Sequence, residues 1–327
     1  MTREAEPRTN TAPQSGSDSL ALAVLAALEQ VDRPTRSQAI DQAAKTVDPD
    51  DLIEVMSDGD NSRRRNAAME ALGRGGTRSV PALLRVLKDS DPEVVMFAAS
   101  VLGRTRDPAA IPHLVSLLDH ADPNVAQAAI DSLAQLRATV AIDSLVKILD
   151  RDPWLRFAVV NALGEIGDTK AVEPLASLLS DETIRLGVIE ALGKIGSAAA
   201  LGHLARMLHE SQDSATFGAC LKAIGQALES QPDEKLLKNI GSWALLSSPD
   251  AAVRRATVMA LSRFPSRVVM RHLVAAAKDS DIPVRRAVVE ALAQYADLAA
   301  RAALARCCLD LDPEVASAAW RHTETAG

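Results

Sequence analysis

Apolar residues recur in a helical pattern along this chain, and the pattern returns about every 30 residues. In the segment 94–103 (VVMFAASVLG), apolar side chains stand at positions i, i+4, i+7 and i+8, which places them on one face of an α-helix. A second apolar run of the same period follows, as in 106–119 (RDPAAIPHLVSLLD). No run alternates apolar and polar residues as a β-strand would. The pattern predicts pairs of helices that repeat along the chain.

Each pair is anchored on one residue at the start of its first helix. The anchors follow a short acidic motif such as DPEV, and they succeed one another at intervals of 29 to 32 residues, with a single interval of 37. They are Val94, Val125, Leu155, Ile184, Val253, Val284 and Val315, with weaker copies at Thr35, Arg64 and Thr216. Each unit can bury its apolar face only against its neighbours, so a near-constant period indicates a stacked array. We predict an all-α fold, an α-solenoid of about nine to ten stacked helix pairs.

The residues around each anchor predict where the helices begin and end. Three positions before each anchor, from Arg64 onward, stands aspartate or asparagine, the types favoured as helix N-caps. Pro92, Pro123, Pro153 and Pro313 follow four of these caps and are expected at the first helical position. Glycine recurs nine residues past five of the anchors, which predicts close helix contact or helix termination. These glycines are Gly73, Gly103, Gly164, Gly193 and Gly225.

The segment Asp152–Leu179 carries nearly the whole motif D-P-x-V-R…A-L-G-x-I-G-D…A-V-x-x-L-x-x-L-L. With this motif the chain resembles HEAT repeats of the short, bacterial, phycobilisome-lyase-like type, over roughly residues 33–322. The resemblance implies a HEAT-like superhelix whose second helices line the concave surface. The family includes scaffolds, signalling adaptors and chromophore-attachment subunits, so the resemblance does not specify a function.

The ends of the chain and its longest interval suggest how it is organised. Residues 1–18 are polar and contain two prolines and a glycine, which predicts a disordered tail. We expect residues 19–327 to form the solenoid, with a break near residues 229–240, where the interval of 37 falls. The apolar run Leu20–Leu28 is too short to span a bilayer and lacks a positively charged flank. We therefore expect a cytoplasmic protein with no membrane partner.

Charge and composition narrow the classes of partner. The chain has 43 acidic and 36 basic residues, a net charge of −7, which argues against a general binder of nucleic acid or anionic membranes. Aromatic residues make up only 2%, so we expect a core of alanine, leucine and valine. Trp154, Trp243 and Trp320 fall in different repeats, although nucleic-acid binding calls for clustered aromatic side chains.

The cysteines and histidines favour neither a metal site nor a cofactor. Cys220, Cys307 and Cys308 lack the CxxC spacing of a zinc site, and they replace apolar core residues of other repeats. Arg306 beside Cys307 leaves open a reactive thiol in this pair. We predict no metal, no cofactor and no catalytic residue.

Three histidines invite a metal hypothesis because they recur at the same position of the repeat. His113, His203 and His272 each lie 19 residues past an anchor. Stacked helices are about 8–10 Å apart, so histidines two or three repeats apart are separated by roughly 20 Å or more and cannot share a metal.

An arginine follows five of the anchors directly. These are Arg65, Arg156, Arg185, Arg254 and Arg285. Four residues before each stands the predicted N-cap aspartate, or Asn61 in the earliest copy. We interpret the series as an Asp–Arg hydrogen-bond ladder that joins adjacent repeats, in preference to a ligand-binding ladder.

A basic stripe is predicted on the polar face of the second helices. The positions 15, 19 and 22 residues past the anchors carry cations and no carboxylate. The predicted partner-binding residues are Arg85, His113, Lys147, Lys170, His203, Arg206, Lys235, Lys238, His272 and Arg306. The alternative is a solvated face without a partner.

These observations favour a non-catalytic scaffold or adaptor. We predict that it binds an acidic protein segment along a basic groove formed by the second helices. One alternative is a subunit that resembles E/F-type bilin lyases, which act on acidic phycobiliproteins, although no residue here is identified as bilin-binding. Nucleic-acid binding is a further alternative, which the net charge disfavours.

Overall fold

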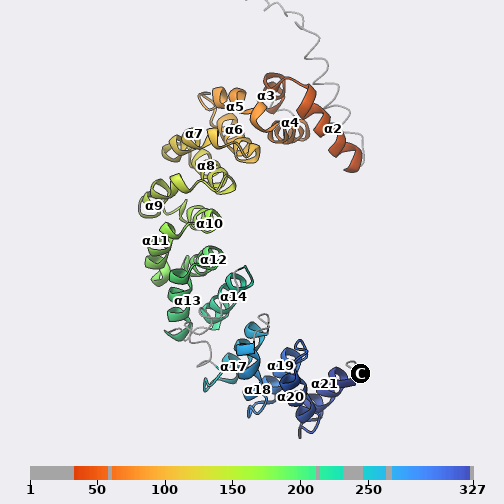
Figure 1. Ribbon diagram of the computed structural model, residues 1–327. Helices are drawn as coiled ribbons and strands as arrows, with labels where there is room; N and C mark the ends of the chain where they lie inside the picture. The colour runs from red at the N-terminus through yellow and green to blue at the C-terminus, as the bar shows by residue number, and fades with distance from the viewer. Residues whose placement is uncertain (1–32, 58–60, 211–213, 231–245, 263–266, 325–327) are drawn as a thin grey trace, which may run out of the picture. The chain divides into compact units, whose positions relative to one another are not determined.

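The computed structural model describes residues 33–57, 61–210, 214–230, 246–262 and 267–324, and every regular element in these ranges is a helix (Figure 1). The chain divides into two compact units, residues 1–151 and 152–327, and each is described by itself. Both contain the predicted helix pairs, so the predicted α-solenoid is confirmed. The predicted tail at residues 1–18 and most of the predicted break near 229–240 lie outside the described residues.

The first unit alternates helices that begin near an anchor, here called first helices, with second helices. The first helices are α2 (Arg33–Thr46), α4 (Ser62–Arg74), α6 (Pro92–Thr105) and α8 (Pro123–Gln135). The second helices are α3 (Pro49–Ser57), α5 (Val80–Val86), α7 (Ile111–Ser116) and α9 (Ile142–Arg151). Short 3-10 helices occur at Gly76–Arg78, Pro108–Ala110, Leu117–Asp119 and Thr139–Ala141.

The second unit continues the same alternation. Its first helices are α10 (Arg156–Ile166), α12 (Arg185–Ile195), α14 (Ser214–Ser230), α17 (Ala251–Leu261), α19 (Ile282–Leu292) and α21 (Pro313–Glu324). Its second helices are α11 (Val172–Ala176), α13 (Ala198–Glu210), α18 (Arg267–Ala276) and α20 (Leu298–Cys307). Two 3-10 helices, Thr169–Ala171 and Ser177–Ser180, flank α11.

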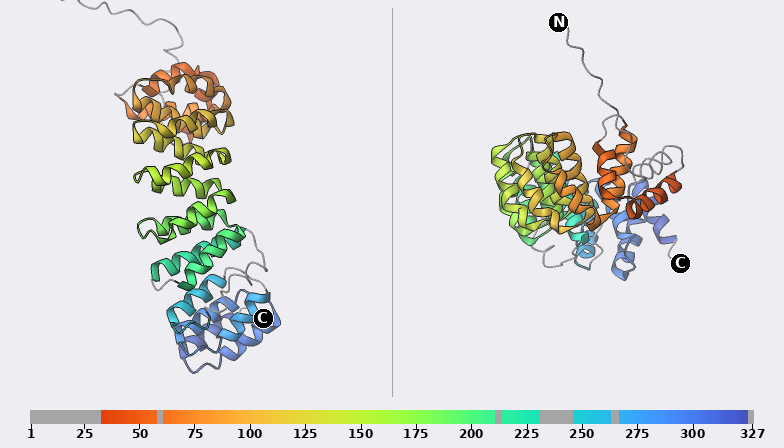
Figure 2. Two further views of the ribbon diagram at one scale, coloured as in Figure 1. Left: turned by 90° about the vertical axis from the view of Figure 1, so that its left-hand side faces the viewer. Right: turned by 90° about the horizontal axis from the view of Figure 1, so that it is seen from above.

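Within each unit the helices form two layers. The first helices of successive pairs pack side by side in one layer, here called the first-helix layer, and the second helices form the other. Figure 2 shows the helices of each unit stacked one above the next. Taken unit by unit, the first-helix layer lies on the inner side of the curve and the second helices lie on the outer side (Figure 1).

Glycines in the first-helix layer explain the direction of this curvature. A Cβ atom on Gly103 of α6 would lie 2.8 Å from the Cα of Ser132 in α8. A Cβ on Gly164 of α10 would lie at the same distance, 2.8 Å, from the Cα of Ala191 in α12. Helix backbones approach this closely only where a side chain is missing. The close contact predicted for these glycines is confirmed, and it draws the first helices together on the inner side.

Aspartate side chains cap the first helices as predicted. An Asp91 carboxylate oxygen accepts the backbone N–H of Glu93 at 2.9 Å, and Asp281 accepts that of Val284 at 3.1 Å. Pro92 is the first residue of α6, as expected. Pro153 is an exception, because α10 begins only at Arg156 and Pro153 lies in the preceding turn.

Removal of one cap tests its contribution to stability. Asp122 accepts the N–H of Asn124 at 2.8 Å at the start of α8. We expect Asp122→Ala to lower the free energy of unfolding by about 1 kcal/mol in urea denaturation followed by circular dichroism. Asp122→Asn keeps an acceptor oxygen and should stay close to wild type. Equal losses in both variants would show that the charge, and not the cap, carries the effect.

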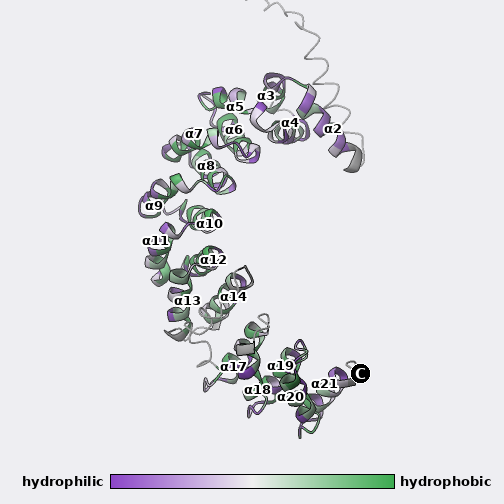
Figure 3. Cartoon of the chain, in the orientation of Figure 1, coloured by the Kyte–Doolittle hydropathy of each residue, from purple (hydrophilic) through white to green (hydrophobic). Residues whose placement is uncertain are grey.

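The core lies between the two layers and is built from aliphatic side chains. The anchors Val125, Val284 and Val315 are fully buried, as are Leu133 and Leu163. Apolar and hydrophilic positions alternate around the helices, as amphipathic packing requires (Figure 3). Among the described residues, no helix combines the length and the apolar character that a membrane span needs.

Candidate functional site

The predicted basic stripe lies on the outer side of each unit's curve. In the first unit its members are on α5, α7 and α9, and in the second unit they are on α13, α18 and α20, with Lys170 in the 3-10 helix before α11. Lys235 and Lys238 lie outside the described residues. The stripe therefore does not line an inner groove, and that part of the prediction is wrong because the glycine contacts place the first helices inside. Binding of a partner by these residues stays a prediction.

Two side chains of the stripe already have acidic partners. Arg85 donates to a carboxylate oxygen of Asp50 at 2.7 Å, from α5 to α3. The His203 ring nitrogen lies 3.1 Å from a carboxylate oxygen of Glu173 on α11. Burial lowers the pKa of His272, which disfavours its charged form. His113, Lys147, Lys170, Arg206 and Arg306 are exposed.

The arginines after the anchors form the predicted ladder between adjacent repeats. Arg254 donates to Asp279 at 2.7 Å, and Arg285 donates to Asp310 at 2.8 Å. Arg156 reaches Asp181 at 3.0 Å. The partner is the acid 25 residues further on, and not the predicted acid four residues before. The earlier aspartates, Asp152, Asp250 and Asp281, accept backbone N–H groups near the start of their own first helices.

The other two arginines vary this arrangement. The Arg185 Nε donates to the carbonyl oxygen of Leu179 at 2.8 Å, and its guanidinium lies 3.8 Å from Glu182. Arg65 lies 3.6 Å from Glu93 and 4.8 Å from the centroid of the Phe97 ring. The structural interpretation of the arginine series is thus confirmed for the contacts that join repeats.

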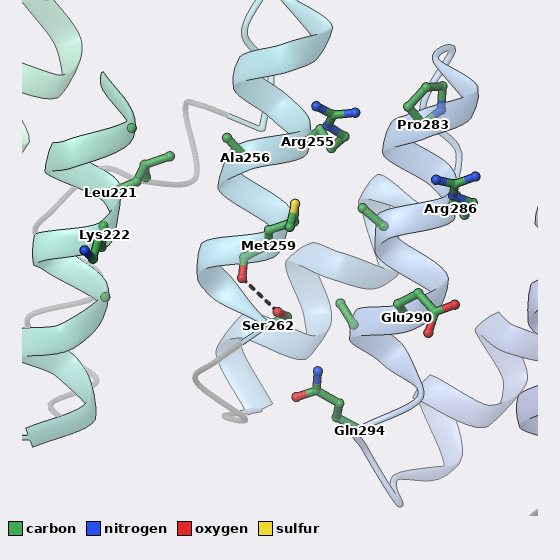
Figure 4. Close-up of a pocket in the computed structure, with 14 residues that line it drawn as sticks. Leu221, Lys222, Arg255, Ala256, Met259, Ser262, Pro283, Arg286, Glu290 and Gln294 are labelled. Carbon is green, nitrogen blue, oxygen red and sulfur yellow. Dashed lines mark hydrogen bonds between the residues drawn. The ribbon is translucent and has the colours of Figure 1, made fainter. Parts of the chain in front are cut away.

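A cavity of about 930 Å³ opens on the first-helix layer of the second unit, where α14, α17 and α19 meet (Figure 4). Small residues make room for it, among them Gly218 and Gly225 of α14 and Ala287 of α19. Leu221 is a buried part of its lining, while Met259 is 59% exposed. The lining is therefore apolar over much of its area.

Three exposed cations line the cavity. Figure 4 shows Lys222 on α14, Arg255 on α17 and Arg286 on α19. Arg286 pairs with Glu314 of α21 at 2.9 Å, whereas Lys222 and Arg255 form no ion pair with a residue that the structure describes. Glu290 is the one acid in the lining, and its carboxylate lies 2.9 Å from His322. The cavity thus joins an apolar lining to two cations, Lys222 and Arg255, that have no acidic partner among the described residues.

Exposed apolar side chains lie further along the same layer of the second unit. Trp154 is 88% exposed, Phe157 59% and Leu186 51%. Phe157 and Leu186 stand two residues past their anchors, on the face that the apolar pattern leaves outside the core. Sequence reasoning missed these residues and the cavity because it ranked the second helices first. The signal that could have found them is large apolar residues at this outward position.

The cysteines are explained by packing. Cys220 and Cys307 are buried, as predicted. Burial raises the pKa of the Cys220 thiol to about 12 and also raises the pKa of Cys307. Both side chains therefore favour the neutral thiol over the thiolate that a nucleophile needs. Cys308 is half-buried, with its sulfur 3.8 Å from the Thr323 hydroxyl. In the described part of the chain, no three His, Cys, Asp or Glu residues gather as a metal site.

Comparison with known proteins gives a family match over most of the chain. Residues 49–134, 80–158, 111–186, 142–225 and 242–321 match the family model described as HEAT repeats. None of the curated proteins matches the chain.

Several solved structures are similar to the chain at low sequence identity. Importin beta is 13% identical with a TM-score of 0.50, over 95% of this chain and 51% of that one. An engineered protein is 19% identical with a TM-score of 0.45, over 93% and 98%. The complex of CpcE and CpcF of phycocyanin lyase from a Nostoc species is 19% identical with a TM-score of 0.39, over 74% and 92%. At such identities, the likeness to importin beta shows the fold alone.

Proposed function

Since the chain belongs to the HEAT-repeat family, whose repeats commonly bind proteins, we propose that it is a non-catalytic protein-interaction scaffold. In this proposal it holds an acidic segment of a partner protein at the cavity between α14, α17 and α19. The observation that carries the proposal is the pair of cations, Lys222 and Arg255, which lie beside an apolar lining and have no ion-pair partner in the part of the chain that the structure describes.

The chemistry of the cavity suits an acidic segment that also carries apolar side chains. Carboxylates of the segment would form charge-assisted hydrogen bonds with Lys222 and Arg255. Its apolar side chains would pack against the lining and remove the exposed side chain of Met259 from water. Exposed charges further away than about 8 Å are largely screened at physiological salt, so the local cations outweigh the net charge of −7.

The cations of the second helices are the rival surface for the same kind of partner. Lys147 on α9 and Arg206 on α13 are exposed. They lie on the second helices, on the outer side of their units, and neither lines the cavity between α14, α17 and α19. Charge alone at an exposed surface contributes little affinity, so we favour the cavity.

Two charge reversals distinguish these surfaces. We expect a partner that wild type captures from native lysate at about 150 mM salt to be lost by at least tenfold with Lys222→Glu/Arg255→Glu. Lys147→Glu/Arg206→Glu serves as the matched control and should keep the partner, with quantitative mass spectrometry as the readout. Circular dichroism first confirms that both variants are folded. Loss of the partner only with the second-helix pair would overturn the choice of the cavity.

The alternative function, a subunit of an E/F-type bilin lyase, is not proposed. No observation on the described residues favours chromophore attachment over protein binding. The nucleic-acid alternative also lacks a supporting geometry among the described residues. Trp154 lies in the turn before α10 and Trp320 lies on α21, several repeats apart, and Trp243 lies outside the described residues.

A further inference from the structure

One row of residues runs across the first-helix layer of the second unit. Its members stand two residues past the anchors of α10, α12, α14, α17 and α19. In order they are Phe157, Leu186, Gly218, Arg255 and Arg286. The row is apolar at its α10 end, has glycine in the middle and is cationic at its α19 end.

The apolar end of the row gathers large exposed side chains on neighbouring helices. Phe157 and Leu186 come from adjacent first helices that pack side by side, and both are more than half exposed. Trp154, in the turn before α10, is 88% exposed and adds a third large apolar side chain next to α10. Exposed residues of this size on neighbouring helices mark a contact surface more than scattered single ones do.

The charges on α10 and α12 differ from those at the cavity. Lys194 lies 2.9 Å from Glu165 and 3.1 Å from Glu190, so its charge is already neutralised there by two acids. At the other end, Lys222 and Arg255 have no described acidic partner. An acidic residue of a ligand is therefore favoured near α17 and disfavoured near α10 and α12.

Gly218 connects the two ends. A Cβ atom placed on Gly218 would meet nothing within 4 Å, and the residue also lines the cavity. The backbone of a bound segment can therefore come close to α14 at this point. In the row, Gly218 thus stands between the apolar members on α10 and α12 and the cations of the cavity.

We infer that the two ends of the partner segment differ in chemistry. One end carries apolar or aromatic residues and lies on α10 and α12, and the other end carries acidic residues and enters the cavity. This inference rests on the proposed function and extends its site. Successive first helices lie about 8–10 Å apart, so the row spans roughly 32–40 Å. An extended segment of about 10–12 residues covers that length at roughly 3.3 Å per residue.

A display library of random linear 16-residue peptides tests the inference without a known partner. The full chain is the bait, and the selected peptides are measured against Phe157→Ser/Leu186→Ser and against Lys222→Glu/Arg255→Glu. We expect selected peptides with apolar residues grouped at one end and acids at the other, and at least tenfold weaker binding to each variant. Deleting the apolar end of a peptide should also weaken its binding to wild type at least tenfold. The same deletion should not weaken binding to Phe157→Ser/Leu186→Ser any further.

The outcomes separate the inference from the proposed function. If binding of the peptides is weakened only by Lys222→Glu/Arg255→Glu, the inference is overturned and the proposed function stands. If binding is weakened only by Phe157→Ser/Leu186→Ser, the proposed cavity is overturned. Acids found at both ends of the selected peptides would also overturn the inferred order. Lys147→Glu/Arg206→Glu is the control and should bind every selected peptide as wild type does.

Discussion

Replacing Arg285 by methionine is expected to lower the free energy of unfolding by about 3 kcal/mol, because it leaves a half-buried carboxylate without its cation. Arg285 donates from Nε to Asp310 at 2.8 Å and from Nη2 at 2.9 Å, which makes the pair bidentate. Its Nη1 donates to the carbonyl of Asp279 at 2.9 Å, so the same side chain also fixes the loop between α18 and α19. Urea denaturation followed by circular dichroism measures the loss.

The neighbouring arginine provides the matched control. Arg286 pairs with Glu314 at 2.9 Å, but these side chains are 56% and 69% exposed, against 15% and 12% for Arg285 and Asp310. Exposed pairs are worth about 0–1 kcal/mol, so Arg286→Met should cost less than about 1 kcal/mol. Equal costs for the two variants would show that the ladder pair adds nothing beyond an ordinary surface contact.

The same pair should make the stability depend on acid pH. The hydrogen bond from Arg285 holds the pKa of Asp310 below its usual value, and Arg254 does the same for Asp279. A lowered folded pKa means that the stabilisation is present above the unfolded pKa of about 3.9 and is lost as the pH falls through the folded pKa. We expect Arg285→Met to lose less stability than wild type between about pH 5 and pH 2. If the free energy of unfolding of wild type and of Arg285→Met changed in parallel with pH, the pH dependence could not come from this ion pair.

The repeat, the helix pairs and the caps could be predicted from the sequence because they depend on local spacing. Asp91 and Asp281 cap helices within a few residues of their own position, and any chain with that spacing would be expected to do the same. The partner of Arg285 is different. Asp310 lies 25 residues away, and only the stacking of one repeat on the next brings the two together.

The side of the array that faces inward depends on distances between helices that residue types alone do not specify. The glycines predict close contact, but the partner of Gly103, Ser132, is set by how one repeat stacks on the next. The resemblance implies that the second helices lie inside, and the structure places the first helices there instead. The cavity at α14 falls in the interval of 37 between Thr216 and Val253, so the irregular interval is the sequence signal that lies nearest to it.

Replacing Gly164 by alanine is expected to lower the free energy of unfolding by about 1–3 kcal/mol. Helix propensity alone predicts the opposite sign, since alanine in a helix interior is favoured over glycine by roughly 0.5–1 kcal/mol. The contact decides the sign, because the new Cβ would lie 2.8 Å from the Cα of Ala191, and a backbone atom cannot move aside as a flexible side chain can. The helices α10 and α12 must therefore separate and lose contact along the inner layer.

Gly202→Ala in α13 isolates the propensity term, because a Cβ there would meet nothing within 4 Å. That variant should gain roughly 0.5–1 kcal/mol in the same urea denaturation. Opposite signs for two identical substitutions in the helices of one unit can arise only from the contact between first helices. If Gly164→Ala also stabilised the protein, the backbones of α10 and α12 would have to lie further apart than described, and the glycine explanation of the curvature would fail. The same measurement therefore tests both the glycine explanation of the curvature and the placement of the cavity on the inner layer.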